Sequence, residues 1–446
     1  MTRTLWTKAL AVALVALGLL AALERVSALV AEREARLREA EANVAASLAT
    51  QQELIGPVLQ RRCEETWSVE VGEGKERKKV NERREFDLVA TPKTLDLDGT
   101  ATIEARRRGL YKVNGYVLKA TLKAAWESLQ LLQPRAEHAP SVLRCGDVVL
   151  FVGVGDARGL RSVAASQVPG KALAVLAGTP RGKMPKGFQV ALTSEQWADG
   201  TFATELRLEL VGTRLLAIAP VADQTQVHLR SDWPHPSFHG RFLPNEREIG
   251  DDGFNAWWRI SALATSAPQD VRGQSDRVET FAVEFIDPVN AYSLADRATK
   301  YGMLFIGLTF LGVALTEVMR RARVHPVQYL LVGSALAIFF LLLVSLSEHM
   351  AFVWAYTGAA AACTALLAFY GAHVLGGWRA GLAFGVAVAT LYGVLYLLLQ
   401  QEQTALVLGS ALLFAVLAAV MVLTRRFDWY RLVDSWRTAK PGSQPA

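Results

Sequence analysis

The side chains best suited to chemistry lie in one short stretch, SDWPHPSFHGRFLPNERE (231–248). It combines three prolines, three aromatic rings, two histidines and two glutamates. Imidazoles and carboxylates that converge could bind a metal ion or act as acid and base. Prolines on both sides of His235, however, hold that residue in an extended segment. The stretch is therefore either a functional site or a rigid corner between strands, and we favour the corner.

A metal site in this region would have to gather ligands from a wider set. The available ligands are His228, His235, His239, Glu246 and Glu248. Their spacing matches none of the standard zinc signatures, which place ligands at short, regular intervals. We therefore predict no metal site and no cofactor.

Recognition is a second use for the same region. The candidate binding residues are Trp233, His235, Phe238, His239, Trp257 and Trp258. Such rings could stack on a sugar or hold a peptide, or they could simply cap the end of a β domain. A hydrolase would need a paired acid and nucleophile, or a Ser-His-Asp set. We find neither, assign no catalytic residue, and favour a non-enzymatic function.

The segment VGVGDARG (152–159) resembles a nucleotide-binding loop only superficially. Its spacing is Gly-x-Gly-x-x-x-Gly, and no helical pattern with a later acidic residue follows it. A dinucleotide site needs that whole context. We predict a tight turn from Asp156 to Gly159, with the glycines providing positive φ.

Apolar runs of membrane-spanning length define where these residues lie. About 20 apolar residues are needed to cross the hydrocarbon of a bilayer. The predicted spans are an N-terminal run at 9–23 and five C-terminal segments at 302–319, 328–346, 351–374, 380–399 and 404–423. The sequence therefore predicts a six-span membrane protein whose water-exposed part lies between the first two spans.

The distribution of lysine and arginine predicts the orientation. Arg3, Lys8, the 320–327 loop, Arg379 and the tail 425–440 carry basic residues on one side, whereas 347–350 and 400–404 carry none. Basic loops stay in the cytoplasm. Both termini are therefore expected inside and the large domain outside, although the basic segment 296–300 is an exception. A cleaved signal peptide ending near 26–28 is the alternative to a retained N-terminal anchor.

Polar residues in the membrane part are few. Glu348 and His349 form a pair at the expected outer mouth, while Glu317 and His373 lie near the inner ends of their spans. Ionisable groups inside a membrane can mark a proton path, but these all lie close to an interface. A transporter is therefore the less favoured alternative.

The chain divides by composition into five parts. These are an N-terminal anchor (1–23), a helical stalk (24–58) ending at Ile55–Val58, a β-rich domain (59–295), a five-helix membrane domain (296–424) and a basic cytoplasmic tail (425–446). Strands are predicted at 110–126 as a hairpin around Asn114-Gly115, and at 147–155, 203–221, 225–233, 253–264 and 278–286. Short alternating strands without helices between them indicate an antiparallel, sandwich-like fold.

Cysteine and charge fit this organisation. Cys63 and Cys145 both fall in the external part, where an oxidising compartment would permit a disulfide; two separate buried thiols are the alternative. The net charge of +6 arises largely from the cytoplasmic loops, which contact anionic lipid. No basic groove with interleaved aromatics is present, so we predict no nucleic-acid partner.

Several motifs occur in the same order as in a known family. They are VGDARG (154–159), SDWPHPSF (231–238), FLP (242–244), DRATKY (296–301), HPVQYLLVG (325–333), LSEH (346–349) and DWY (428–430). Taken together, they resemble the CreD family of inner-membrane proteins. The resemblance implies an N-terminal anchor, a large periplasmic domain, a C-terminal membrane bundle and expression under a stress-responsive sensor–regulator pair. It brings no catalytic residues.

The resemblance thus implies an inner-membrane protein that supports cell-envelope integrity. Its β domain would recognise an envelope or wall component, or a membrane-protein partner, and its helices would lie in the lipid bilayer. The alternative is a membrane enzyme or transporter that handles a lipid or wall precursor. The sequence does not determine the ligand or the oligomeric state.

Overall fold

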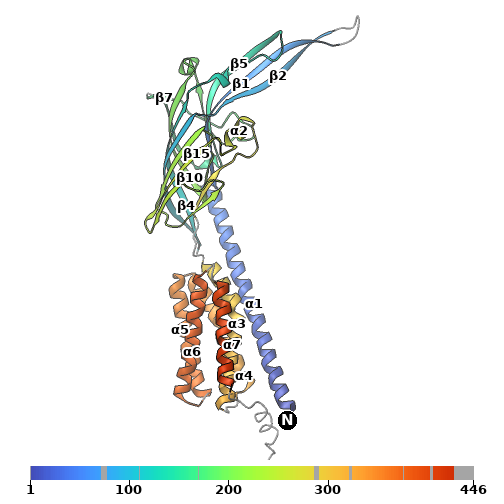
Figure 1. The fold of residues 1–446 in the computed structure, drawn as a ribbon, viewed down its shortest axis with the longest axis vertical. Helices are drawn as coiled ribbons and strands as arrows, with labels where there is room; N and C mark the ends of the chain where they lie inside the picture. Colours follow the sequence, from blue (N-terminus) through green and yellow to red (C-terminus); the bar gives the residue numbers. More distant parts are fainter. Residues whose placement is uncertain are drawn as a thin grey trace, which may run out of the picture. The chain divides into compact units, whose positions relative to one another are not determined.

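The computed structural model describes residues 2–71, 78–109, 111–168, 170–285, 291–320, 324–374, 376–401 and 405–425. The chain forms two compact units (Figure 1). The first comprises Met1–Leu37 and Val289–Ala446, and the second comprises Arg38–Pro288. The DWY motif, the basic tail and the arginines at 321 and 323 lie outside the described residues.

One long helix, α1 (Thr2–Ser47), includes the N-terminal apolar run and most of the predicted stalk. Its Ala-, Glu-, Arg- and Leu-rich composition favours helix, as predicted. The prediction that the helix continues to Ile55–Val58 is wrong, because strand β1 (Gln52–Val71) already starts at Gln52. Leu54 and Val58 are fully buried in the β unit, and a Cβ at Gly56 would lie 2.9 Å from the carbonyl oxygen of Phe151. This glycine permits close strand packing and does not end a helix.

Two eight-stranded sheets make up the second unit. The first sheet, sheet A, has the order β13-β16-β11-β1-β5-β9-β8, with β2 paired to β1; the second, sheet B, has the order β14-β15-β12-β3-β4-β10-β6-β7. The strands of sheet A are β2 (Lys78–Ala90), β5 (Ser141–Val154), β8 (Leu176–Ala177), β9 (Gly187–Leu192), β11 (Leu215–Ile218), β13 (Pro236–Gly240) and β16 (Phe281–Phe285), besides β1. Those of sheet B are β3 (Thr94–Arg108), β4 (Tyr111–Trp126), β6 (Leu160–Gln167), β7 (Lys171–Leu173), β10 (Phe202–Thr213), β12 (Gln224–Ser231), β14 (Glu246–Gly250) and β15 (Gly253–Ser261). The predicted sandwich-like fold is confirmed.

The sheets are not purely antiparallel. Strands β1 and β11 pair in parallel, and so do β3 and β12. Parallel neighbours require a crossover, and here the chain crosses between sheets from β10 to β11 and back to β12. Arg214, at φ 65°, lies at the first crossing.

The predicted hairpin at Asn114-Gly115 is misplaced. Both residues lie inside β4, where Gly115 pairs with Glu104 on one side and Thr213 on the other. The turn lies instead near Gly109, at φ 60°. Pairing with β3 and β10 on its two edges holds β4 extended and overrides the local turn preference of Asn114-Gly115.

The predicted turn after β5 is confirmed, but its glycines do not provide positive φ. A short 3-10 helix, η3 (Ala157–Gly159), forms the turn, and neither Gly155 nor Gly159 has positive φ. A Cβ on Gly155 would lie 2.8 Å from the Gln51 carbonyl oxygen, and one on Gly159 would lie 2.1 Å from that of Val211. These glycines therefore allow backbones to approach closely.

The two sheets enclose one apolar core. Its largest fully buried side chains in this unit include Trp258, Tyr116, Phe151 and Phe281, contributed by both sheets. Gln52 of β1 pairs with Leu216 of β11, which in turn pairs with Val283 of β16. The chain therefore enters and leaves the sandwich at the same end.

The C-terminal part of the first unit is a helical bundle. It contains α3 (Ala291–Arg320), α4 (Pro326–Ser347), α5 (Phe352–Val374), α6 (Trp378–Gln400) and α7 (Ala405–Thr424). Each predicted C-terminal span falls within one of these helices or within a residue of its ends. In the part of the chain that the structure describes, five helices (α1, α3, α4, α5 and α6) are long and apolar enough to cross a membrane, and α7 carries a shorter apolar stretch at Val407–Val422.

Helix α1 packs into this bundle. Leu19 and Leu23 are buried in the apolar cluster of the bundle. A Cβ on Gly333 of α4 would lie 2.1 Å from Leu19 Cδ1, and one on Gly302 of α3 would lie 3.1 Å from Leu23 Cδ1. Small residues let membrane helices approach closely, so these two glycines allow α1 to pack against α4 and α3.

A larger side chain at the contact of α1 with Gly333 is expected to destabilise the bundle. Gly333→Leu places a bulky side chain where Leu19 lies, and overpacking of this kind costs about 1–3 kcal/mol. Thermal unfolding of the purified protein in lipid nanodiscs should show a lowered midpoint. Gly307→Leu is the matched control, because a Cβ at Gly307 meets nothing within 4 Å. Equal midpoints for the two variants would contradict the packing of α1 on Gly333.

Candidate functional site: the polar face of one sheet

The 231–248 stretch runs along one margin of the sandwich. After β12 of sheet B it forms β13, an edge strand of sheet A, and then β14, an edge strand of sheet B. Prolines suit such positions because an edge strand needs fewer backbone donors. The segment is thus a corner that crosses between the sheets twice.

The aromatic candidates of this region do not share one surface. Phe238 packs edge-on against Phe254 and Trp258, at ring-centroid distances of 5.8 and 5.7 Å. Trp258 is 1% exposed and donates its indole N–H to the Phe242 carbonyl oxygen. Trp257 faces the other way, since successive strand residues point to opposite sides. Of the two tryptophans, only Trp257 is on the outer face.

The remaining candidates in the stretch also pair locally. Trp233 donates its indole N–H to the His235 carbonyl oxygen at 3.0 Å. His239 Nε2 lies 2.9 Å from Glu284 Oε2 and also 2.9 Å from Ser237 Oγ. Within the described residues, no three His, Cys, Asp or Glu side chains come together as a possible metal site. The histidines of the 231–248 stretch therefore do not converge.

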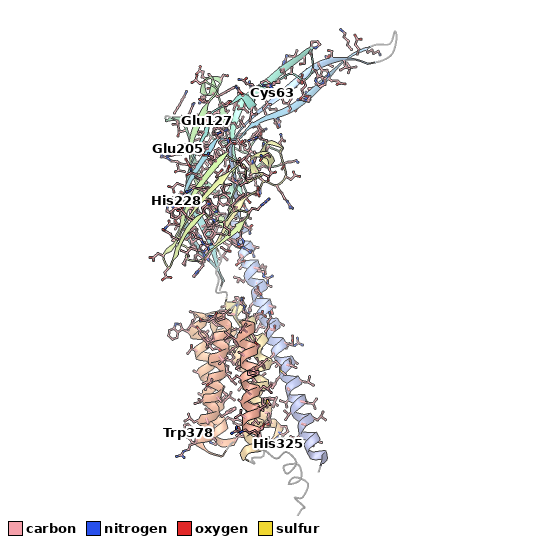
Figure 2. The ribbon with its side chains drawn as sticks, viewed as in Figure 1. Cys63, Glu127, Glu205, His228, His325 and Trp378 are labelled. Carbon is pink, nitrogen blue, oxygen red and sulfur yellow. A yellow bond between two sulfur atoms is a disulfide. The ribbon has the colours of Figure 1, made fainter. Side chains whose placement is uncertain are left out.

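Trp257 belongs instead to a row of side chains that crosses the outer face of sheet B from β6 to β14. The row follows the strand pairing through Ala164, Arg207, Thr121, Asp98, His228, Trp257 and Glu246. His228 stacks on the Trp257 ring at 4.7 Å between centroids and 6° between planes. Figure 2 labels His228 on β12 and Glu205 on β10, both on this sheet.

The face is hollowed into a groove of about 930 Å³. We call it the sheet B groove. Its charged lining consists of five basic side chains (Lys119, Lys123, Arg207, Arg230 and Arg259) and three acidic ones (Asp96, Asp98 and Glu209). Asp98 accepts from Arg230 at 2.7 Å, and Glu209 lies 3.3 Å from Arg161. The groove is therefore polar and net basic, and the stacked rings of Trp257 and His228 line it on the outer face.

Sequence reasoning found Trp257 and His228 but missed the rest of the groove. Alternation of polar and apolar residues in β3, β4, β10 and β12 was a usable signal for which side chains face out. Placing those side chains next to each other, however, requires the strand order. That order depends on the parallel β3–β12 pair, which no local pattern indicates.

Glu348 and His349, the predicted polar pair at the mouth of the membrane helices, have different surroundings. Glu348 Oε1 lies 3.5 Å from Arg33 Nε of α1 and accepts from the Tyr292 hydroxyl at 3.3 Å. His349 is exposed. At the opposite ends of α1 and α3, Lys8 of α1 forms an ion pair with Glu317 of α3. These contacts fix α1 to the bundle at both ends.

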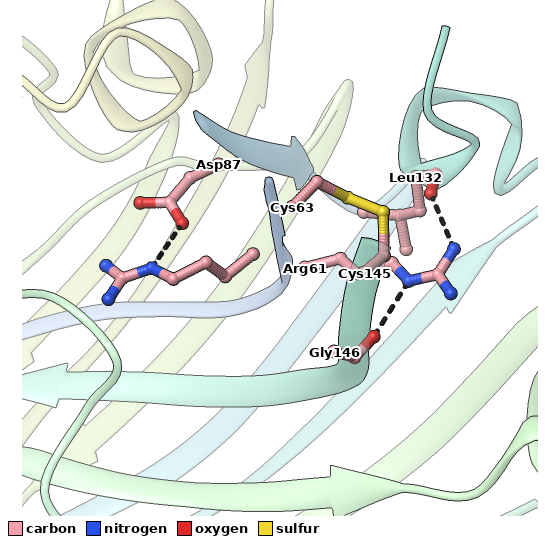
Figure 3. The surroundings of a disulfide bond; sticks show 7 residues. Arg61, Cys63, Asp87, Leu132, Cys145 and Gly146 are labelled. Atoms are coloured by element: carbon pink, nitrogen blue, oxygen red, sulfur yellow. Dashed lines mark hydrogen bonds and ion pairs between the residues drawn. A yellow bond between two sulfur atoms is a disulfide. The ribbon is translucent and has the colours of Figure 1, made fainter. Parts of the chain in front are cut away.

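Cys63 and Cys145, for which the sequence left a bond and separate thiols open, are joined by a disulfide (Figure 3). The bond links directly opposite positions of β1 and β5, where these strands and β2 continue beyond the sandwich as a ribbon (Figure 1). Arg61 donates to the carbonyl oxygens of Gly146 and Leu132 beside it. The disulfide thus fastens the base of the ribbon.

The fold defines a class: a multi-span membrane protein with a large β sandwich inserted after its first apolar helix. Comparison with known proteins gives the family. The model of the family described as inner membrane protein CreD matches residues 4–430. The chain is 34% identical over 405 residues to inner membrane protein CreD of Escherichia coli (strain K12), covering 90% of this chain and 88% of that protein. The chain therefore belongs to the CreD family and is an inner membrane protein.

Two solved structures show a distant similarity to this chain. A putative nutrient binding protein from Legionella pneumophila gives a TM-score of 0.24 at 8% identity, covering 48% of this chain and 82% of that chain. An M1 zinc metallopeptidase from Deinococcus radiodurans gives 0.20 at 10% identity, covering 44% and 42%. Similarity this low carries no functional argument.

Proposed function

We propose that this inner membrane protein supports cell-envelope integrity by binding rather than by catalysis. Its β unit lies outside the cytoplasm and recognises an envelope component through the sheet B groove. The proposal depends mainly on the groove, which is a concave, net basic surface with an aromatic side chain among polar ones. Sites of this kind bind ligands of matching shape and charge.

Two observations support the external position of the β unit. Basic residues gather in the short connections on the side of Lys8 and Arg379, as expected for cytoplasmic loops. The Cys63–Cys145 disulfide suits an oxidising compartment such as the periplasm. Both favour a cytoplasmic N-terminus and an external sandwich.

The orientation is tested by labelling single added cysteines with a membrane-impermeant maleimide on spheroplasts. Lys171→Cys, on an exposed edge strand, should react in intact spheroplasts. Trp378→Cys, 69% exposed at the start of α6, should react only after permeabilisation. The reverse pattern would overturn the proposed orientation.

The envelope function is tested by deleting the gene and measuring uptake of a dye that the intact envelope excludes. Uptake should rise in the deletion strain and return to the wild-type level when the full chain is supplied. Unchanged uptake, under both ordinary growth and envelope stress, would overturn the proposed function.

A further inference from the structure

We propose that two copies of this chain pair through the outer edge of strand β2, so that the ribbon of one copy continues into the ribbon of the other. The pairing is antiparallel and centred on Arg83. Val80 of one copy lies opposite Phe86 of the other. Glu82 of one copy lies opposite Arg84 of the other. This interface lies outside the sheet B groove and does not depend on the proposed function.

The outer edge of β2 is available for pairing along most of the ribbon (Figure 1). Among the described strands, β2 pairs only with β1, from Lys78 to Ala90. Residues 78–83 are all exposed, and β2 contains no proline. An unpaired edge presents backbone N–H and C=O groups to any strand that reaches it. This part of β2 can therefore accept a further strand.

At the base of the ribbon the surroundings of β2 change. Helix α2 (Ala267–Arg272) and the residues after it lie beside this end of the strand. Gln274 donates to Asp87 at 3.0 Å, and Arg272 donates to Thr91 at 2.8 Å. The edge that a second copy can approach therefore ends close to Phe86.

The side chains along the available edge are self-complementary. When Arg83 lies opposite its own copy, every other residue faces the one that is equally far from Arg83 on the other side. Glu82 and Arg84 then face each other twice, and so do Val80 and Phe86. Pairs of opposite charge, and an aromatic ring opposite a β-branched side chain, are cross-strand contacts that stabilise sheets. One interface thus contains two ion pairs and two apolar pairs.

The charges near the centre are compatible with this pairing. Arg83 lies 3.1 Å from Glu85 of its own strand, so its charge is already partly compensated. Glu82 is exposed and, among the described residues, takes part in no ion pair. Arg84 pairs with Glu137, but a guanidinium has enough donors for a second carboxylate. Glu82 therefore gains an ion pair when a second copy binds.

The neighbouring registers are less favourable. Backbone hydrogen bonds alternate along an antiparallel pair, so the register shifts only in steps that keep equivalent residues opposite each other. One step toward Lys78 places Glu82 opposite Glu82 and Val80 opposite Arg84. One step toward Ala90 places Arg84 opposite Arg84 and brings in Leu88, beyond the residue that Gln274 contacts. The register centred on Arg83 avoids both.

A second copy fits this edge better than the alternative role of its charges. Charged residues on an edge strand can also guard against unspecific pairing, and they do so by repulsion. In the register centred on Arg83, opposite charges meet instead. Copies of this chain are confined to the same membrane, which raises their effective concentration and favours even a small interface.

Disulfide cross-linking of the full chain in isolated membranes tests this interface. Directly opposite Cα atoms of an antiparallel pair are about 4.5–5.5 Å apart, which a disulfide can bridge. Arg83→Cys should therefore form a covalent dimer on oxidation. Val142→Cys is the matched control, because Val142 is 58% exposed on β5, on the other side of β1 in the same ribbon. The wild type, whose remaining thiol at Cys363 is buried, gives the background.

Charge reversal tests the register. Glu82→Arg should reduce cross-linking through Arg83→Cys by about tenfold, because both ion pairs become pairs of like charge. Adding Arg84→Glu exchanges the two charges and should restore cross-linking. Lys171→Gln, which removes a charge from an exposed strand of sheet B, should leave cross-linking unchanged.

Three results would overturn the inference. The first is equal cross-linking of Arg83→Cys and Val142→Cys. The second is a charge reversal at Glu82 that has no effect, or whose effect Arg84→Glu does not reverse. The third is a cross-link from Arg83→Cys to a different protein in place of a second copy, which mass spectrometry of the cross-linked product would detect.

Discussion

Replacing Cys63 and Cys145 together with alanine is expected to lower the free energy of unfolding of the β unit by about 4 kcal/mol. The two cysteines are 82 residues apart. Cross-linking so long a segment removes many conformations from the unfolded chain, and this loss of entropy stabilises the folded state. The effect should be concentrated in β1 and β5, which the bond joins.

Amide hydrogen exchange in nanodiscs measures this directly, because protection in β1 and β5 reports their opening free energy. The double variant should exchange faster in both strands, and a reductant should reproduce the effect in the wild type. The reductant should have no effect on the double variant, in which the free Cys363 remains as the internal control. Unchanged protection after reduction would contradict the predicted contribution of the bond.

Asp156→Ala is expected to lower the free energy of unfolding of the β unit by about 3 kcal/mol. The Asp156 side chain is only 6% exposed. It accepts from the Thr50 backbone N–H at 3.0 Å, the Thr50 hydroxyl at 3.2 Å and the Arg158 guanidinium at 2.6 Å. Removing the buried carboxylate deletes these hydrogen bonds, and hydrogen bonds to a charged group contribute about 1.5–3 kcal/mol. Urea unfolding of wild type and variant provides the comparison.

The same carboxylate predicts a pH dependence. Hydrogen bonding to the Arg158 guanidinium holds the pKa of Asp156 well below its usual range. A carboxyl whose pKa is lower in the folded than in the unfolded state contributes stability above its unfolded pKa of about 3.9. That contribution is lost as the pH falls below about 4 toward the folded pKa. Asp156→Asn should therefore flatten the acid limb of the stability curve, and parallel curves for wild type and variant would contradict this account.

Much of the fold could be predicted from the sequence because its signals are local. Apolar runs of span length predicted the membrane helices, an apolar run rich in valine predicted β5, and alternation predicted β10, β12 and β15. Two errors arose where tertiary packing overrides a local signal. Gly56 looks like a helix stop but allows β1 to approach Phe151. Asn114-Gly115 looks like a hairpin turn but is held extended between β3 and β10.

The candidate site was harder to predict for a different reason. The 231–248 stretch concentrates unusual residues, yet it builds both edge strands at one margin of the sandwich, and its three aromatic rings pack against the core. The sheet B groove instead draws single outward residues from strands far apart in the chain. Lys119 and Arg207, for example, look like ordinary solvent-facing positions until β4 and β10 are paired. Such a site depends on topology, which local patterns do not determine.

The central claim is that this protein maintains the envelope by recognition through the sheet B groove. Its most direct test is dye uptake in a deletion strain that expresses the full chain with Lys119→Gln, Lys123→Gln and Trp257→Ala at the wild-type level in the membrane. Uptake should remain as high as in the deletion strain, while the Lys171→Gln control restores exclusion of the dye. Full restoration by the triple variant would contradict the claim.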